Sequence, residues 1–91
     1  MNRSEQIEKK IKEIKDLLIL KNNNYGDSAL SPIRVFSKTN SLEGLMIRID
    51  DKLSRIQTVG ITDETEDTVK DLVGYLILLM IAREEDESNS I

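Results

Sequence analysis

Apolar residues recur at every third or fourth position in three stretches of the chain, which is the spacing of amphipathic α-helices. The predicted helices cover about residues 5–21, 42–57 and 64–83. Residues that favour a helix N-terminus precede or open them: Ser4, Ser41 and the pair Asp63 and Glu66. The pattern therefore predicts an all-α protein with three main helices.

The segment between the first two predicted helices is polar and rich in turn-forming residues. Residues 22–28 read NNNYGDS, a composition that ends a helix and forms a loop. Ser31 and Pro32 resemble an N-cap followed by proline at the first helical position. They predict a fourth, short helix over about residues 33–36.

The third predicted helix changes character along its length. Its first turns are acidic, whereas residues 76–82 are apolar on every side of the helix. Three helices of one small chain can hardly cover such a segment, so we expect a small helical bundle completed by oligomerisation, a homo-oligomer formed through this last helix. Residues 1–83 are expected to form a single domain, and the acidic residues 84–91 a flexible tail.

The amino-acid composition limits the kinds of catalytic and metal site that the chain can form. The 91 residues include 13 Lys and Arg, 17 Asp and Glu, no Cys and no His, which gives a formal net charge of −4. Disulfides, thiolate or imidazole metal sites, cysteine nucleophiles and Ser-His-Asp triads are therefore excluded. A bound metal would be a hard cation held by oxygen, such as Mg²⁺, and catalysis would depend on carboxylates, Lys, Tyr or that metal. The acidic balance argues against direct DNA binding.

The sequence carries no targeting feature. Its N-terminal residues are charged and lack the apolar core of a signal peptide. The longest apolar stretch, residues 72–82, is too short and too interrupted to cross a bilayer. We therefore expect a cytoplasmic protein without a membrane partner.

Four charged residues form one surface of the second predicted helix. Arg48, Asp51, Lys52 and Arg55 stand three or four positions apart along it. One interpretation is a solvated face held by ion pairs within the helix. The other is a binding site in which the three cations neutralise phosphate groups and Asp51 holds a bridging metal.

A second group lies on the third predicted helix. Asp67, Asp71 and Gly74 share one side of it, with Tyr75 beside them. Asp71 borders the apolar segment, and a carboxylate there needs a partner, either a cation of the second predicted helix or a metal ion. Gly74 costs about 1 kcal/mol relative to Ala inside a helix, so we expect close packing or a ligand beside it. An ordinary buried ion pair between two helices explains the same residues equally well.

The loop after the first predicted helix carries a tyrosine beside a glycine. Tyr25 could stack on a base and Asp27 could bind its sugar, and Tyr75 is a second aromatic candidate for the base. Loops of this composition also serve only to turn the chain, and the sequence has no glycine-rich phosphate loop.

Three stretches taken together resemble a known family. They are KNNNYGDSALSPIRVFS at residues 21–37, IRIDDKLSRI at residues 47–56 and EDTVKDLVGYL at residues 66–76. This set is similar to the nucleotide modification-associated domain 1 family, small proteins common in bacteriophages and prophages. That family in turn resembles the all-α nucleoside triphosphate pyrophosphatases of the MazG-like and dimeric dUTPase group.

The resemblance implies a helical bundle that holds Mg²⁺ with acidic motifs on two successive helices, and an activated water that splits a triphosphate into a monophosphate and pyrophosphate. Carried over to this chain, it implies Asp51 and Asp71 as metal ligands, with Asp67 as a substitute. Arg48 and Thr68 stand where the motifs would have Glu, so the acidic quartet is incomplete. Fewer carboxylates and more cations favour holding phosphates over hydrolysing them.

Three functions follow from these observations. The chain is expected to bind a nucleotide, either as a metal-dependent nucleoside triphosphate pyrophosphatase or as a non-catalytic binder. The binder would suit a phage protein that sequesters a nucleotide immune signal of its host. The third alternative is a structural or interaction module whose charged face is only solvated. The sequence leaves open whether the chain is an enzyme.

Overall fold

The computed structural model describes the backbone of residues 1–62 and 66–89, and the side chains of residues 1–62 and 68–87. Within these residues the chain forms three helices and no strand: α1 (Arg3–Asn24), α2 (Ser41–Val59) and α3 (Glu66–Asn89). The predicted all-α fold with three main helices is confirmed.

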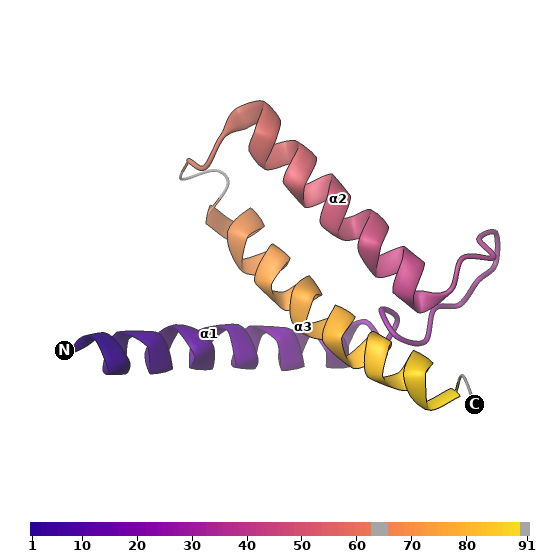
Figure 1. Cartoon of the computed structure of the whole chain (residues 1–91), viewed down its shortest axis with the longest axis horizontal. Coiled ribbons are helices and arrows are strands. Elements are labelled where there is room, and N and C mark those ends of the chain that lie inside the picture. Colours follow the sequence, from indigo (N-terminus) through magenta and orange to yellow (C-terminus); the bar gives the residue numbers. More distant parts are fainter. Residues whose placement is uncertain (63–65, 90–91) are drawn as a thin grey trace.

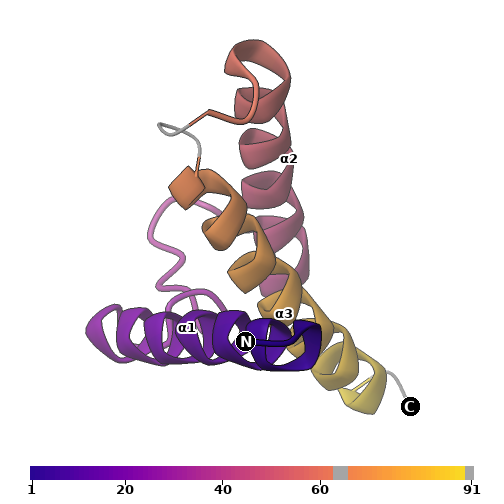
Figure 2. The same ribbon diagram turned by 90° about the vertical axis from the view of Figure 1, so that its left-hand side faces the viewer.

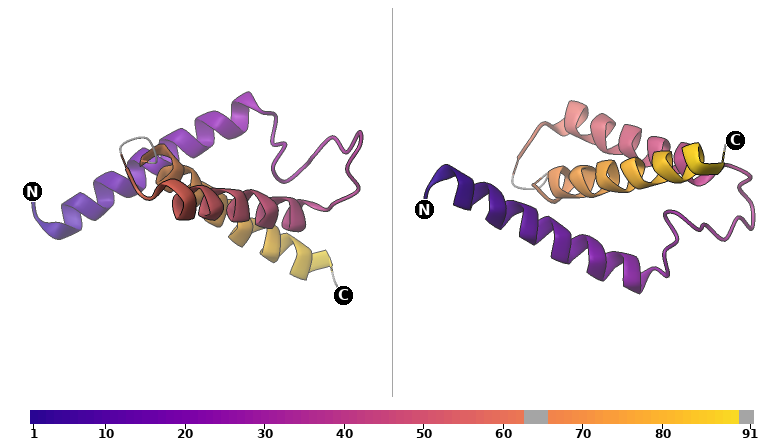
Figure 3. Two further views of the ribbon diagram at one scale, coloured as in Figure 1. Left: turned by 90° about the horizontal axis from the view of Figure 1, so that it is seen from above. Right: turned by 60° about the horizontal axis from the view of Figure 1, so that its bottom comes forward.

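Helices α2 and α3 form an antiparallel hairpin, and α1 crosses α3 at an angle (Figure 1). A view from the side of the N-terminus shows that α1 lies across α3 and away from α2 (Figure 2). Among the described helices, α1 packs only against α3, and less extensively than α2 does. The first half of α1 extends beyond the hairpin (Figures 1 and 3).

The core is small and lies between the two hairpin helices. Leu45 of α2 is only 1% exposed and packs with Leu78 and Ala82 of α3. Leu18 of α1 is partly buried against this cluster, whereas no residue of α1 is fully buried. The fold therefore depends on the hairpin, and α1 is attached along only part of its length.

The first two helices begin slightly earlier than predicted. Asn2 and Asn40 are the N-caps, and the side chain of each accepts a hydrogen bond from the backbone N–H three residues later, at 2.9 and 2.8 Å. Ser4 and Ser41 therefore lie inside the helices. Asn and Ser are about equally good caps, so the sequence pattern does not distinguish them.

The acidic end of the chain is more regular than predicted. Helix α3 continues through Asn89, so the backbone of residues 84–89 is helical, and the flexibility of this end stays a prediction. Glu is a good helix former, which explains why the helix passes Arg83. Residues 90–91 lie outside the described residues. The predicted capping box cannot be placed either, because Asp63 and the side chain of Glu66 are not among those that the structure describes.

The predicted short helix over residues 33–36 is wrong, because this segment is irregular. Arg34 has a φ of 61°, a left-handed conformation that cannot continue a right-handed helix. The apolar side chains of the segment are exposed, Phe36 to 97%. A single turn without a packing surface gains too little to form a helix.

The apolar segment of α3 is covered on one side only. Leu78 and Ala82 face the core, whereas Met80 is 62% exposed and Leu76 and Ile77 are partly exposed. The cover on every side that the sequence calls for is therefore not provided by the chain's own helices. None of the described helices is both long and apolar enough to cross a membrane.

Candidate functional site

Two neighbouring hollows hold most of the charged and aromatic residues that the sequence singled out. The inner hollow, of about 410 Å³, lies between α1 and α3. The outer hollow, of about 300 Å³, is lined by Arg48, Asp51, Lys52, Arg55 and Tyr75. Arg48 and Tyr75 line both, so the two hollows are parts of one site.

The inner hollow combines apolar surface with a charged rim. Leu18 of α1 and Leu78 of α3 supply apolar surface, together with their neighbours on the same helices. Lys21, Lys70 and Asp71 supply the charges. This mixture is typical of ligand sites, where apolar walls exclude water and a few polar groups fix orientation.

Asp71 joins the three helices electrostatically. Its Oδ1 accepts a hydrogen bond from Lys21 Nζ of α1 at 2.9 Å, and its Oδ2 lies 3.4 Å from Lys52 Nζ of α2. Of the two partners considered for Asp71, a cation of the second helix or a metal ion, Lys52 provides the first. The second partner, Lys21, was not anticipated.

The two lysines keep Asp71 ionised. Partial burial acts to raise the pKa of Asp71, but the hydrogen bonds and charges of Lys21 and Lys52 together outweigh it, so the pKa lies below its ordinary value. The hydrogen bond to Asp71 raises the pKa of Lys21. With two ammonium groups around one carboxylate, the cluster retains an excess of positive charge.

The site as a whole is cationic in an acidic chain. The cations that line the two hollows are Lys21, Arg48, Lys52, Arg55 and Lys70. Only two carboxylates, Asp51 and Asp71, line them as well. Because the chain has a formal net charge of −4, this local excess of cations is the reverse of the overall balance. Such a concentration of one sign favours an anionic ligand.

The two tyrosines of the chain both line the site, but Asp27 does not. Tyr25 lines the inner hollow, and Tyr75 lines both. Asp27 is not among the lining residues; its carboxylate accepts a hydrogen bond from the Ser31 hydroxyl at 3.3 Å, and its φ is 61°. The Asp27 side chain therefore forms a hydrogen bond within the turn, and its role in binding a sugar stays a prediction.

Gly74 lies where α1 crosses α3. A Cβ atom at this position would lie 3.5 Å from Leu18 Cδ1, an ordinary van der Waals distance. A methyl group would therefore fit beside Leu18, and the contact does not by itself require glycine at this position. Gly74 also lines the inner hollow, so it belongs to both the helix contact and the site.

The residues of the site fit an anion better than Mg²⁺. Among the side chains that the structure describes, no three carboxylates are grouped so as to hold a metal ion. Asp71 is already neutralised by two lysines, and Thr68, where the resemblance implies Glu, is buried. The side chain of Asp67 lies outside the described ones. The assignment of Asp51, Asp67 and Asp71 as Mg²⁺ ligands therefore stays a prediction.

Lys21 and Lys70 are the charged site residues that sequence reasoning missed. Both are lysines among many on helical surfaces, and their type alone carries no signal. Lys21 stands in line with the apolar stripe of α1, three residues after Leu18 and four after Leu17. That position marks it as a residue able to reach a neighbouring helix, but the neighbour itself is fixed only by the fold.

The chain was compared with known protein families, curated proteins and solved structures, and no significant match was found in any of the three. Functional conclusions therefore depend on the residues of the two hollows.

Proposed function

We propose that this chain binds a nucleotide, with the phosphates in the outer hollow and the base in the inner one. The observation that supports this most is the concentration of five cations around two hollows that also contain both tyrosines. Phosphates need cationic hydrogen-bond donors, and a base needs aromatic and apolar surface. We also propose, from the resemblance of three stretches of the sequence, a relationship to the nucleotide modification-associated domain 1 family and with it a phage origin.

Arg48, Lys52 and Arg55 are suited to the phosphates. They line the outer hollow from successive turns of one face of α2. A guanidinium group can donate two parallel hydrogen bonds to one phosphate, whereas an ammonium group acts as a compact charge. Lys52 already lies 3.4 Å from Asp71, so a phosphate would compete with that carboxylate for the same ammonium group.

Tyr25 and Tyr75 are suited to the base. Tyr25 is exposed at the rim of the inner hollow, and Tyr75 stands between the two hollows. Stacking of a base on an aromatic ring contributes about 1–3 kcal/mol. The apolar surface of Leu18 and Leu78 would cover the other parts of the base. We place this binder in the cytoplasm, as a homo-oligomer formed through α3.

The second candidate is a Mg²⁺-dependent nucleoside triphosphate pyrophosphatase. It is favoured by Asp51, a carboxylate that lines the same hollow as the three cations of α2. Asp51 and Asp71 would hold the metal ion. When bound, the ion would polarise a phosphate group and activate a water molecule for attack. In this case the cations would orient the phosphates and stabilise the charge that develops during cleavage.

One incubation separates these functions. The purified protein is mixed with nucleoside triphosphates or cyclic nucleotides, with Mg²⁺ or with EDTA, and the products are separated by chromatography. Intact nucleotide recovered from the heat-denatured protein establishes a binder that sequesters its ligand. Mg²⁺-dependent release of monophosphate and pyrophosphate establishes the enzyme. If no nucleotide is bound or converted, the proposal is wrong and the structural module remains.

Arg48→Ala tests the phosphate site. Because Arg48 lines both hollows, its loss should raise the Kd for a nucleotide by about tenfold or more, measured by calorimetry. The matched control is Arg34→Ala, which removes an exposed arginine of the loop that lines neither hollow. Equal effects of the two variants would contradict the assignment of Arg48.

Asp71→Asn distinguishes the two functions by the sign of its effect. In a phosphate binder, Asn frees Lys52 from a competing carboxylate but also removes the ion pair that joins α1 to α3, so binding of pyrophosphate alone to the outer hollow should be retained or increase. In a metal-dependent enzyme the same change removes a ligand, so Mg²⁺-stimulated turnover should be lost. Circular dichroism of the variant checks that the helices are intact.

A further inference from the structure

Each chain carries two uncovered apolar surfaces that lie toward opposite ends of the molecule, whose longest dimension is 45 Å. The first, which we call the arm, is residues 3–15 of α1, where Ile7 and Ile11 are 52% and 63% exposed. The second, the outer face of α3, includes Ile77 and Met80 and ends in acidic residues. Figure 1 shows the N-terminal end of α1 and the C-terminal end of α3 on opposite sides of the molecule.

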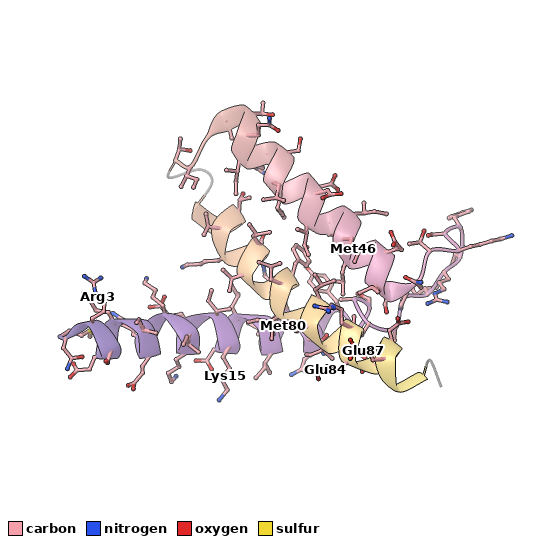
Figure 4. The ribbon with its side chains drawn as sticks, in the orientation of Figure 1. Arg3, Lys15, Met46, Met80, Glu84 and Glu87 are labelled. Atoms are coloured by element: carbon pink, nitrogen blue, oxygen red, sulfur yellow. The ribbon has the colours of Figure 1, made fainter. Side chains whose placement is uncertain are left out.

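The apolar row of the arm is bordered mainly by cations. On an ideal helix of about 100° per residue, three cations lie within about 80° of the row formed by Ile7 and Ile11, and Glu8 is the only acid as near. These cations are Arg3, Lys10 and Lys15. Arg3 and Lys15 project from α1 in Figure 4.

The outer face of α3 has the opposite charge. Ile77 and Met80 continue along the same side of the helix into Glu84 and Glu87, all exposed. Met80, Glu84 and Glu87 follow one another along the C-terminal half of α3 (Figure 4). This face therefore presents an apolar row followed by carboxylates.

We infer that two copies of the chain assemble reciprocally, with the arm of each packed on the outer face of α3 of the other. In an antiparallel register, Ile7 meets Met80 and Ile11 meets Ile77 of the second copy. Arg3 then meets Glu84, because Arg3 stands four residues before Ile7 and Glu84 stands four residues after Met80. A two-fold axis makes both contacts equivalent and closes the assembly at two chains.

The assembly specifies the contacts and the number of chains of the homo-oligomer that we propose, and it would also bear on the site. Leu18 and Lys21 line the inner hollow from α1, a helix that its own chain holds along only part of its length. A second copy that holds the arm would fix the position of these two residues. Assembly is measured without nucleotide, so its failure and that of nucleotide binding are separate results.

The mass of the full-length protein in solution tests the inference. Sedimentation over a wide concentration range should give twice the chain mass of 10.4 kDa, with no larger species. Ile11→Asp and Met80→Asp should each raise the dimer dissociation constant by at least about tenfold, since each buries a carboxylate in an apolar contact. The matched control, Phe36→Asp, changes a side chain that is 97% exposed outside both surfaces and should leave the dimer intact.

A charge exchange tests the register. Arg3→Glu and Glu84→Arg should each weaken the dimer, and the double variant should restore most of the loss. A wild-type protein that stays monomeric, a mass that keeps growing with concentration, or a dimer that survives both aspartate variants would each overturn the inference. If the dimer of the double variant dissociates more readily than that of either single variant, the antiparallel register is wrong.

Discussion

The α2–α3 hairpin and helix α1 are built from similar amphipathic sequences but are stabilised in different ways. The hairpin encloses Leu45, Leu78 and Ala82, the only hydrophobic residues that are buried among the described side chains. Helix α1 has no fully buried residue and is joined to α3 at the Leu18–Gly74 crossing and by the Lys21–Asp71 ion pair. The hairpin therefore depends on apolar burial, whereas α1 depends on local helix stability and on charge.

This difference places the candidate site at the boundary between a firm and a weakly held element. Arg48, Lys52 and Tyr75 come from the hairpin, whereas Lys21 and Tyr25 come from α1 and its C-terminal end. A ligand that contacts both groups would add contacts between them. We therefore expect ligand binding to stabilise the docking of α1 more than the hairpin.

The largest effect is expected in the hairpin core. Leu45→Ala should lower the free energy of unfolding by about 2–5 kcal/mol, because it removes a side chain that is 1% exposed at the centre of the only core cluster described. Urea denaturation followed by circular dichroism measures it. Ile33→Ala removes the same number of carbon atoms from a side chain that is 85% exposed and should change the free energy by less than about 0.5 kcal/mol. Similar losses in the two variants would contradict the assigned core.

Acid should release α1 before it affects the hairpin core. The pKa of Asp71 is lowered in the fold, so its contribution to stability is complete above the ordinary pKa of about 4 and is lost as the pH falls through the lower folded value. Protonation removes the partner of both Lys21 and Lys52. NMR amide shifts around Lys21 and Gly74 should therefore change below about pH 4. The Asp71→Asn variant is the control, and an identical acid transition in it would show that other carboxylates are responsible.

Removing one lysine should have a smaller effect of the same kind. Lys21→Met keeps the length of the side chain but removes the ion pair between α1 and α3, so amide hydrogen exchange in α1 should accelerate relative to α2. Lys12→Met is matched, because Lys12 pairs with Asp16 inside α1 at the same distance of 2.9 Å. It should leave the docking of α1 unchanged. Equal acceleration in both variants would mean that the Lys21–Asp71 contact does not hold α1.

The sequence predicts the helices well because their apolar periodicity is a local property. It predicts the partner of Asp71 only in part, since the charge of Lys52 is visible but the crossing of α1 over α3, which brings Lys21 close, depends on tertiary packing. The short helix over residues 33–36 fails because Ser31 and Pro32 supply a start signal without a surface for the helix to pack on. The helix at the acidic end of α3 was not predicted, because charged residues with good helix propensity have the same composition as a polar tail.

The charged face of α2 was also predicted only as far as local spacing allows. The spacing of Arg48, Asp51, Lys52 and Arg55 predicts that they share a surface, and all four line the outer hollow. It does not reveal that Lys52 also reaches a carboxylate on α3, because that contact is set by how the hairpin closes. The incomplete acidic quartet could be read directly from Arg48 and Thr68, whereas the burial of Thr68 could not.

A methyl group at the crossing of α1 and α3 should change the stability only slightly. Gly74→Ala should raise the free energy of unfolding by up to about 1 kcal/mol, because Ala is the better helix former and its Cβ atom would contact Leu18 at an ordinary 3.5 Å. Gly44→Ala in α2 is the matched control, since its Cβ atom would meet nothing within 4 Å and the gain there comes from helix propensity alone. A larger gain at Gly74 would measure the packing of α1 on α3, and a loss there would show that the crossing is too tight for a methyl group. Because Gly74 also lines the inner hollow, a variant that is more stable but binds nucleotide more weakly would place the ligand against this glycine.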